Sequence, residues 1–258
     1  MLKEMQMEQP QTLTGRRAIV TGGGIGIGLG VVRQLAASGA RVALTTHSRS
    51  AQEAVDALAG EGLEVIGIEL DATDSTAVDA VVDDLAGRLG GLDVVVNNAG
   101  GLLARHRVAD MTDEHWDAVW RVNVSSVFYV SRAALRHLGD GGRIVNVSSL
   151  AGRNGGGNGS GAYATAKAAV DGFTRALAKE VAADGITVNS IAPGLILDTP
   201  FHETFTPKAD QEKTIASIPV ARPGYPADVA SAVEYYARTD SGFVTGTVLD
   251  LNGGVHFS

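Results

Sequence analysis

The strongest constraint on the fold of this chain is the regular alternation of short apolar runs with helical segments. The apolar runs are rich in Val and Ile and have the length of buried strands: residues 17–20, 41–46, 64–70, 93–96, 143–149, 186–191 and 247–251. The segments between them show helical spacing of apolar residues. Strands that alternate with helices in this way indicate a parallel, doubly wound α/β sheet with helices on both faces.

The expected helices are marked by their start and stop signals as well as by their periodicity. Ser50 and Glu53 have the spacing of a capping box, and Gly39 and Gly90 stand where two helices should end. The helices are expected at residues 29–36, 50–58, 78–89, 112–138, 161–181 and 228–237. The stretch from 192 to 226 is less regular and indicates a lid or a crossover; as a lid it would comprise about 195–217.

Composition narrows the function classes. The formal net charge is −8 and no basic run is present, which argues against binding to nucleic acid or to an anionic membrane surface. There is no cysteine, so disulfides, thiol catalysis and cysteine-ligated metal are excluded. No apolar run has the length of a membrane span. These features fit a cytoplasmic protein, with residues 1–14 as a loosely ordered tail and 15–258 as one domain.

A glycine cluster follows the first strand directly. Gly22, Gly26 and Gly28 stand between that strand and the first helix, which is where a phosphate-binding turn occurs. Such glycines allow a tight turn, close approach of the backbone to a pyrophosphate, and packing of helix on strand. A plain glycine-rich connection is the alternative. Three residues separate the first two glycines, where the commonest dinucleotide fingerprint has one.

A tyrosine and a lysine stand four residues apart near the start of the helix expected at 161–181. Tyr163 and Lys167 therefore point to the same side of that helix. A nearby ammonium group favours a phenolate and is expected to lower the pKa of the tyrosine from its usual value of about 10. A tyrosine tuned in this way can exchange a proton with a carbonyl oxygen or an alcohol. Most pairs with this spacing are ordinary helix surface, so the interpretation depends on the surrounding motifs.

Taken together, the motifs resemble those of the short-chain dehydrogenases/reductases. They occur in that family's order: Thr21-Gly-x-x-x-Gly26-x-Gly28, Asn97-Asn98-Ala99-Gly100, Asn123, Ser149, Tyr163-x-x-x-Lys167, Asn189 and Pro193-Gly194. The resemblance covers residues 16–254. It implies a single Rossmann-type domain with a seven-stranded sheet, a nicotinamide cofactor, and assembly into homotetramers or dimers.

The resemblance also implies a role for each matching catalytic residue. Tyr163 would be the general acid/base, and Lys167 would hold the nicotinamide ribose. Ser149 would hydrogen-bond the substrate oxygen; it is preferred to Ser148 because Ser149-Leu150-Ala151-Gly152 matches the family's Ser-x-x-Gly. Asn123 would anchor a water that links Lys167 to solvent. An asparagine among apolar helix residues must in any case find hydrogen-bond partners.

Cofactor choice is read at the end of the second strand. An acid there binds a ribose 2′-hydroxyl and repels a 2′-phosphate. This chain has Thr46-His47-Ser48-Arg49 instead, and an arginine can bind phosphate bidentately, so NADP(H) is favoured. NAD(H) stays possible because Ile25 stands where many NADP-using relatives have a basic residue. The full set of expected cofactor contacts is Gly22, Gly24, Ile25, Gly26, Ile27, Gly28, Thr46, His47, Ser48, Arg49, Asp71, Ala72, Asn98, Ala99, Gly100, Tyr163, Lys167, Pro193, Gly194 and Thr199.

Two departures from the family pattern fall on the substrate side. Thirteen residues separate Ser149 from Tyr163, where the family usually has twelve. The extra residue most simply lies in the glycine-rich stretch 154–161, whose shape the sequence leaves open. Thr199, expected to contact the nicotinamide carboxamide, also arrives one position later than usual.

These residues predict an oxidoreductase that interconverts a carbonyl and a secondary alcohol on a small molecule. The alternative is a 3-oxoacyl-carrier-protein reductase, but Asp140 and Asp184 stand where such relatives place arginines that receive the acidic carrier. Arg132, Arg136 and Arg143 are possible compensation. A non-catalytic dinucleotide-binding regulator is a further alternative, although Ser149, Tyr163 and Lys167 are all present. No metal is expected, because His202 and Glu203 have no convincing partner ligands.

Overall fold

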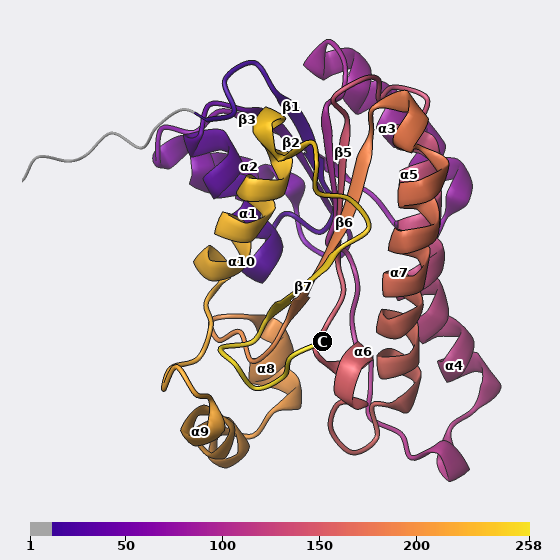
Figure 1. Cartoon of the computed structure of the whole chain (residues 1–258), viewed down its shortest axis with the longest axis vertical. Helices are drawn as coiled ribbons and strands as arrows, with labels where there is room; N and C mark the ends of the chain where they lie inside the picture. Colours follow the sequence, from indigo (N-terminus) through magenta and orange to yellow (C-terminus); the bar gives the residue numbers. More distant parts are fainter. Residues whose placement is uncertain (1–11) are drawn as a thin grey trace, which may run out of the picture.

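Seven parallel strands form one sheet in the order β3-β2-β1-β4-β5-β6-β7 (Figure 1). The structure, a computed structural model, describes residues 12–258. The strands are β1 (Arg17–Val20), β2 (Arg41–Thr46), β3 (Val65–Glu69), β4 (Val94–Asn97), β5 (Arg143–Val147), β6 (Thr187–Pro193) and β7 (Val248–Leu251). The predicted seven-stranded, doubly wound sheet is confirmed.

Helices cover both faces of this sheet (Figure 1). One face carries α1 (Gly26–Ala37), α2 (Ala51–Gly60) and α10 (Pro226–Ala237), and the other carries α3 (Ser75–Leu89), α5 (Ser126–Ala134) and α7 (Gly161–Glu180). The remaining helices are α4 (Asp113–Trp120), α6 (Ala151–Asn154), α8 (Pro200–Phe205) and α9 (Lys208–Ser217). Helices α8 and α9 lie together beyond the carboxyl end of the sheet (Figure 1), in the segment that was expected to form a lid.

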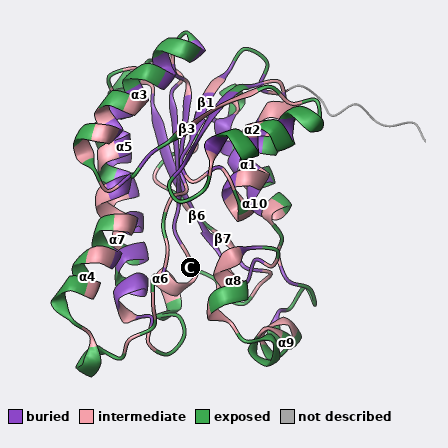
Figure 2. Ribbon diagram, turned by 180° about the vertical axis from the view of Figure 1, so that it is seen from behind, coloured by how far each residue is buried: buried purple, intermediate pink, exposed green. Residues whose placement is uncertain are grey.

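Two apolar clusters, one on each face, hold the layers together (Figure 2). In the first, Leu35 of α1 and Val233 of α10 pack with Val20 of β1. In the second, Leu85 of α3 and Val130 of α5 pack with strand residues of the opposite face. Strand residues are buried on both sides, which explains why these strands read as continuous apolar runs rather than as alternating ones.

The long helix expected at 112–138 is present but is not regular. Thr112 caps it as predicted, accepting a hydrogen bond from the backbone N–H of His115. The middle, Arg121–Ser125, is a π-helical turn, and the last helical stretch ends at Ala134. A π turn inside an α-helix is frequent at functional sites because it turns one side chain out of the regular stripe. Here the turn contains Asn123.

Three local predictions were wrong. The side chain of Ser50 makes no capping hydrogen bond, so the expected capping box is not formed. The lid is helical rather than irregular. The predicted tail, 1–14, is too long: Leu13 is buried in the core and its N–H donates to Ser38 O, because the chain must pass over the end of α1 to enter β1. The rest of that tail, 1–11, lies outside the described residues.

Candidate active site

The order of the strands sets the position of the site. Strand β1 lies between β2 and β4. After β1 the chain adds β2 and β3 on one side of it, and from β4 onward it adds strands on the other side. Val20 is in register with Leu44 of β2 and with Val96 of β4, which brings the carboxyl ends of all three strands to one edge. Ligands of open α/β sheets bind at such a switch point.

The glycine turn after β1 has the geometry of an anion-binding loop. Gly22 and Gly26 have φ of +64° and +53°, a region that favours glycine. A Cβ on Gly28 would lie 2.1 Å from the carbonyl oxygen of Gly22, so only glycine fits at that position. Helix α1 begins at Gly26 with no acidic residue in its first turn. Its free N–H groups and positive end therefore suit a phosphate, and the residues present fit a dinucleotide.

The loop after β4 is bound to this turn. Asn98 donates through Nδ2 to the carbonyl oxygens of Thr21 (3.0 Å) and Gly22 (3.1 Å). The backbone N–H groups of Asn98 and Ala99 both donate to Thr21 Oγ1 at 3.1 Å. The turn after β1 and the loop after β4, which come from the two halves of the sheet, are therefore joined by four hydrogen bonds.

The end of β2 presents no acidic side chain. His47, Ser48 and Arg49 are exposed, whereas Thr46 is buried and its hydroxyl donates to the carbonyl oxygen of Arg49 at 2.7 Å. The hydroxyl of Thr46, an expected cofactor contact, therefore donates its proton within its own loop. The cationic Arg49 and the hydroxyl of Ser48 remain at the surface.

The other expected cofactor contacts lie around the same edge. Asp71 accepts two hydrogen bonds at its Oδ1, from the N–H of Thr73 (2.8 Å) and from its hydroxyl (2.7 Å), and these bonds lower the pKa of Asp71. Ala72 beside it is buried. Thr199 is buried against the glycine turn: a Cβ on Gly26 would be 3.5 Å from Thr199 Cβ. The Thr199 hydroxyl donates to Ile196 O at 2.8 Å, so it is directed at its own loop.

The predicted serine and tyrosine meet at the carboxyl end of β5. Ser149 follows that strand, and its hydroxyl lies close enough to the phenol of Tyr163, in the first turn of α7, to lower the pKa of that phenol. The Ser149 oxygen also accepts from the N–H of Ala151 at 3.1 Å, which fixes its position. The structure thus brings these two side chains together, in the arrangement that the resemblance implies.

Lys167 and Asn123 converge next to them. Lys167 is buried and its Nζ lies 5.7 Å from the centre of the Tyr163 ring, while it donates to Val147 O at 2.8 Å. Asn123 is buried, with its Oδ1 accepting from Gly101 N–H (3.1 Å) and its Nδ2 donating to Val119 O (2.8 Å). A Cβ on Gly100 would lie 2.7 Å from Asn123 Oδ1 and 3.1 Å from Lys167 Nζ, so that glycine lets the three segments approach.

The expected lowering of the tyrosine pKa is not found. Burial raises the pKa of Tyr163 to about 12, and the hydrogen bond from Ser149 opposes that rise. Burial likewise lowers the pKa of Lys167 to about 8. The reason is that Tyr163 is only 9% exposed, and a buried phenolate loses more hydration than the neighbouring groups return. At neutral pH the phenol is therefore protonated.

The lid buries Tyr163. Phe201 of α8 lies over it, with ring centres 5.6 Å apart, and Phe205 packs on Phe201 at 5.4 Å. Leu102, Ala162 and Met111 complete an apolar wall beside the phenol. None of these residues belongs to a motif. The lid was predicted, but the aromatic side chains it would place on the site were not.

Arg105 fastens the lid to the lengthened glycine-rich loop. It donates to the carbonyl oxygen of Asn158 at 3.0 Å and twice to that of Phe205, at 3.2 and 3.3 Å. The N–H of the next residue, His106, donates to Gly159 O at 3.0 Å. The extra residue of the loop is thus accommodated by contacts with the segment after β4. No local sequence signal identifies Arg105, because its partners are backbone atoms far along the chain.

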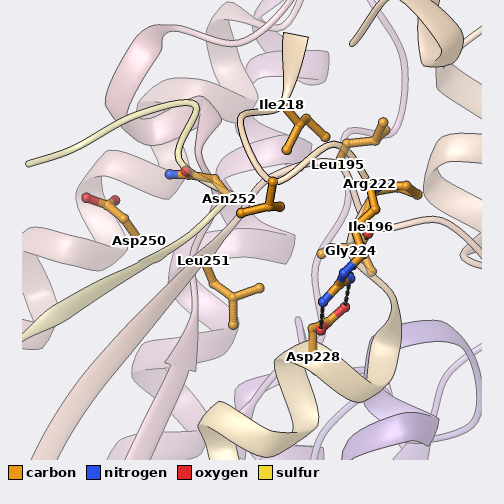
Figure 3. Close-up of a pocket in the computed structure, with 12 residues that line it drawn as sticks. Leu195, Ile196, Ile218, Arg222, Gly224, Asp228, Asp250, Leu251 and Asn252 are labelled. Atoms are coloured by element: carbon orange, nitrogen blue, oxygen red, sulfur yellow. Dashed lines mark hydrogen bonds and ion pairs between the residues drawn. The ribbon is translucent and has the colours of Figure 1, made fainter. Parts of the chain in front are cut away.

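A cavity of ≈ 330 Å³ lies between the segment after β6, the end of β7 and the start of α10 (Figure 3). It is lined by Leu195 and Ile196 after β6, by the end of β7 and by residues that lead into α10, where Arg222 pairs with Asp228 at 2.7 Å. Ser149, Tyr163 and Lys167 do not line it. The candidate site is therefore located by the convergence of Ser149, Tyr163 and Lys167, not by this cavity.

Two other predicted features have clear positions. Arg143 is buried and bonded to the carbonyl oxygens of Arg238 and Thr239, while Arg132 and Arg136 are paired with Asp79. These arginines are engaged within the chain rather than free to receive an acidic partner.

Within residues 12–258, no group of three or more His, Asp or Glu side chains is placed to hold a metal ion, and no helix has the length and apolarity to cross a membrane.

This combination of sheet, glycine turn and serine-tyrosine-lysine site defines a Rossmann-type dinucleotide-dependent oxidoreductase. A family model described as enoyl-(acyl carrier protein) reductase matches residues 23–256. Together with the relatives below, that match shows that the chain belongs to the short-chain dehydrogenase/reductase family.

Three similar proteins illustrate the range of this family. A 3-oxoacyl-(acyl-carrier-protein) reductase, FabG of Haemophilus influenzae, is 38% identical over 95% of this chain and 100% of its own length. A hydroxynaphthalene reductase-like protein, Arp2 of Metarhizium robertsii, is 36% identical over 96% of this chain and 97% of its own. A short chain dehydrogenase of Burkholderia cenocepacia, solved in complex with NADP, superimposes with a TM-score of 0.88 and 37% identity, covering 95% and 99% of the two chains.

Proposed function

We propose that this protein is an NADP(H)-dependent oxidoreductase that interconverts a carbonyl and a secondary alcohol on a small molecule. The observation that carries the proposal is the convergence of Ser149, Tyr163 and Lys167 beside a glycine turn at the sheet's switch point. The nicotinamide cofactor, when bound, supplies or accepts the hydride. Everything else is done by residues of this chain.

The chain's own residues handle the proton and orient the groups. The protonated phenol of Tyr163 is a proton donor for a carbonyl oxygen that gains electron density during reduction. The hydroxyl of Ser149, which lies beside the phenol, would donate its proton to the same oxygen once a substrate is bound. Lys167 adds positive charge, which stabilises a phenolate once the proton has left. Phe201 excludes water from the reacting groups.

The preference for NADP(H) rests on charge at the end of β2. Arg49 and Ser48 are exposed there and no acid is present to repel a 2′-phosphate. The bound NADP of the Burkholderia cenocepacia relative supports the same choice. Gly24 and Gly28 leave no room for a Cβ, and Gly22 and Gly26 have positive φ, so all four positions favour glycine and support a backbone turn that contacts a pyrophosphate.

For the substrate we favour a free small carbonyl compound with an apolar group beside the reacting carbon. Its support is the apolar wall of Leu102, Phe201 and Phe205 and the internal engagement of Arg132, Arg136 and Arg143. The second candidate is a 3-oxoacyl thioester on a carrier protein. The specific observation that favours it is the similarity to the Haemophilus influenzae reductase.

We further propose that the chain assembles as a homotetramer or a dimer. Two separate groups of exposed aromatic and aliphatic side chains support this: Trp116, Trp120 and Phe128 along α4 and α5, and Phe243, Leu249 and Phe257 around β7. Exposed apolar groups of this kind mark subunit contacts in soluble proteins. Sedimentation velocity measures the assembly, and a purely monomeric protein would contradict the proposal. A cytoplasmic location stays a prediction.

The function is tested by following NADPH and NADH oxidation with a panel that contains aromatic ketones, aliphatic ketones and a 3-oxoacyl thioester. We expect NADPH to be preferred, and Tyr163→Phe to reduce kcat by a factor of about 100 or more, the usual range for loss of a general acid. Tyr235→Phe, an exposed tyrosine on α10, is the matched control. Full activity in Tyr163→Phe would refute the assigned proton donor. No turnover with any carbonyl or alcohol, together with tight NADPH binding, would favour the regulator alternative.

A further inference from the structure

Helix α7 carries a second buried charge on the same face as the catalytic lysine. Asp171 is four residues after Lys167, so the two side chains are one helical turn apart. They are 3% and 4% exposed. A buried carboxylate beside a buried ammonium group, both on the active-site helix, requires an explanation because charged groups are rarely buried without a partner.

The carboxylate of Asp171 links α7 to β6 and α6, and through Arg153 to β7. Its Oδ1 accepts from the hydroxyl of Ser190 on β6 at 3.1 Å. Its Oδ2 lies 3.6 Å from Nε of Arg153 in α6. The same Nε lies 3.6 Å from Oδ1 of Asp250 on β7. Arg153 therefore stands between two carboxylates, one of which is next to Lys167.

The ionic contacts of this group are not optimised for stability. Three of its atoms, Arg153 Nε, Asp171 Oδ2 and Asp250 Oδ1, are buried without a hydrogen-bond partner in the described part of the chain. Separations of 3.6 Å exceed hydrogen-bond length, so the attraction is mainly electrostatic. Buried ion pairs with incomplete hydrogen bonding generally contribute little to folding free energy. A role in stability alone is therefore a poor account of the cluster.

Lys167 needs a counter-charge, and Asp171 supplies it. The Nζ of Lys167 donates to Val147 O, and no carboxylate of residues 12–258 lies within ion-pair distance of it. Burial lowers the pKa of Lys167, and the negative charge of Asp171 opposes that effect. Two cations, Lys167 and Arg153, thus share two anions, Asp171 and Asp250. The members of this cluster influence one another strongly because little water screens them.

We propose that Asp171 is a positioning residue of the active site, whose buried carboxylate keeps the Lys167 ammonium charged, while Arg153 and Asp250 set how much of that negative charge the lysine experiences. The inference deepens the proposed function. It predicts that the pKa of Lys167 changes when residues on α6 and β7 are substituted, although those residues do not touch Tyr163.

The direction of each effect follows from the groups that face the cluster. Facing Lys167 are Tyr163, which is neutral at pH 7, and Asp171; facing Asp171 are Arg153 and Arg175, whose Nη1 donates to Asp171 O at 3.2 Å. Removing the negative charge of Asp171 lowers the pKa of Lys167. Removing Asp250 directs Arg153 wholly to Asp171, which gives a smaller fall. Removing the positive charge of Arg153 raises the pKa of Lys167.

The test is a direct titration of Lys167 in the cofactor-free protein. The chain has five lysines, and spectra with ¹³Cε-labelled lysine are assigned by comparison with Lys167→Met. We expect Asp171→Asn to lower the pKa of Lys167 by about 1 unit, Asp250→Asn to lower it by less, and Arg153→Gln to raise it, in line with the size of single-charge effects in buried sites. Asp184→Asn, an exposed carboxylate just beyond the same helix, is the matched control and should change nothing.

A second readout separates this inference from the proposed function. With the best substrate, the alkaline limb of the kcat/KM profile should move to lower pH in Asp171→Asn and return in Asp171→Glu. The inference is overturned if the Lys167 titration is unchanged in Asp171→Asn, or if Asp171→Asn and Arg153→Gln shift it in the same direction. Should Asp171→Asn fail to fold, Asp250→Asn gives the same decision. Because the titration needs neither substrate nor turnover, it stands even where Tyr163→Phe contradicts the assigned chemistry.

Discussion

The nucleotide side and the substrate side of this site are built in different ways. The nucleotide side consists of the turn 21–28 and the loop 97–100, held by backbone and amide hydrogen bonds with no buried charge. The substrate side consists of side chains from distant segments, such as Arg105 bonded to Phe205 and the buried Lys167 near Asp171. The nucleotide side is therefore fixed by backbone shape, whereas the substrate side is set by side-chain contacts and charge.

The largest effect should come from adding one carbon to the nucleotide side. In Gly28→Ala the new Cβ would meet Gly22 O at 2.1 Å, so the turn must shift. We expect NADPH affinity to fall by a factor of about 100 or more and the free energy of unfolding to fall by about 2–4 kcal/mol, as for other overpacked sites. Calorimetric titration and urea unfolding measure the two quantities.

Gly87→Ala is the control for that change. Nothing lies within 4 Å of a Cβ at Gly87, which is inside helix α3. This variant should bind NADPH normally and gain about 0.5–1 kcal/mol of stability, since alanine is the better helix former. Unchanged NADPH affinity in Gly28→Ala would show that the turn is not held by backbone shape.

The second-largest effect should be a rise in the free energy of unfolding when the buried charge of Lys167 is removed from the substrate side. Burial lowers the pKa of Lys167 to about 8, so the folded protein holds this proton less tightly than the unfolded chain, whose lysine has a pKa of about 10.4. Below pH 8 the charged lysine therefore lowers the free energy of unfolding. That reduction becomes smaller as pH rises from about 8 to about 10.4. In the cofactor-free protein, Lys167→Met should be more stable than wild type at pH 7, by at most about 3 kcal/mol.

Urea unfolding of wild type and Lys167→Met from pH 7 to pH 10 tests this prediction. The stability difference should shrink as pH rises, and turnover should be lost at every pH. A difference that stays constant across this range would mean that the folded pKa of Lys167 is not lowered by burial.

The smallest effect should come from the lid. Phe201→Ala removes the ring that covers Tyr163 but leaves the sheet and the glycine turn intact. We expect kcat/KM for apolar ketones to fall about 10-fold, a change of about 1.4 kcal/mol, with NADPH affinity unchanged. Glu203→Ala, an exposed neighbour on the same short helix, is the control. An equal loss of NADPH affinity in Phe201→Ala would show that the two sides of the site are not separable.

Local signals accounted for the elements with regular periodicity and for the motif residues. The tight turn at Gly28 and the shared helix face of Tyr163 and Lys167 could be predicted, because each depends on residues within a few positions. The capping box at Ser50 shows the limit of such signals: the spacing is right, yet the side chain makes no cap. The tail was placed wrongly because nothing near Leu13 in sequence reports that it packs beneath Ser38.

The order of strands and helices, the glycine turn and the predicted site residues could all be inferred from the amino-acid sequence. Their patterns arise from backbone geometry and from spacing along single elements, which are local properties. Only the tertiary structure decided that Tyr163 is buried beneath Phe201, that its pKa is raised rather than lowered, and that Asp171, Arg153 and Asp250 meet beside Lys167. Burial and electrostatic fields depend on every segment that packs around a group, and those segments come from distant parts of the chain.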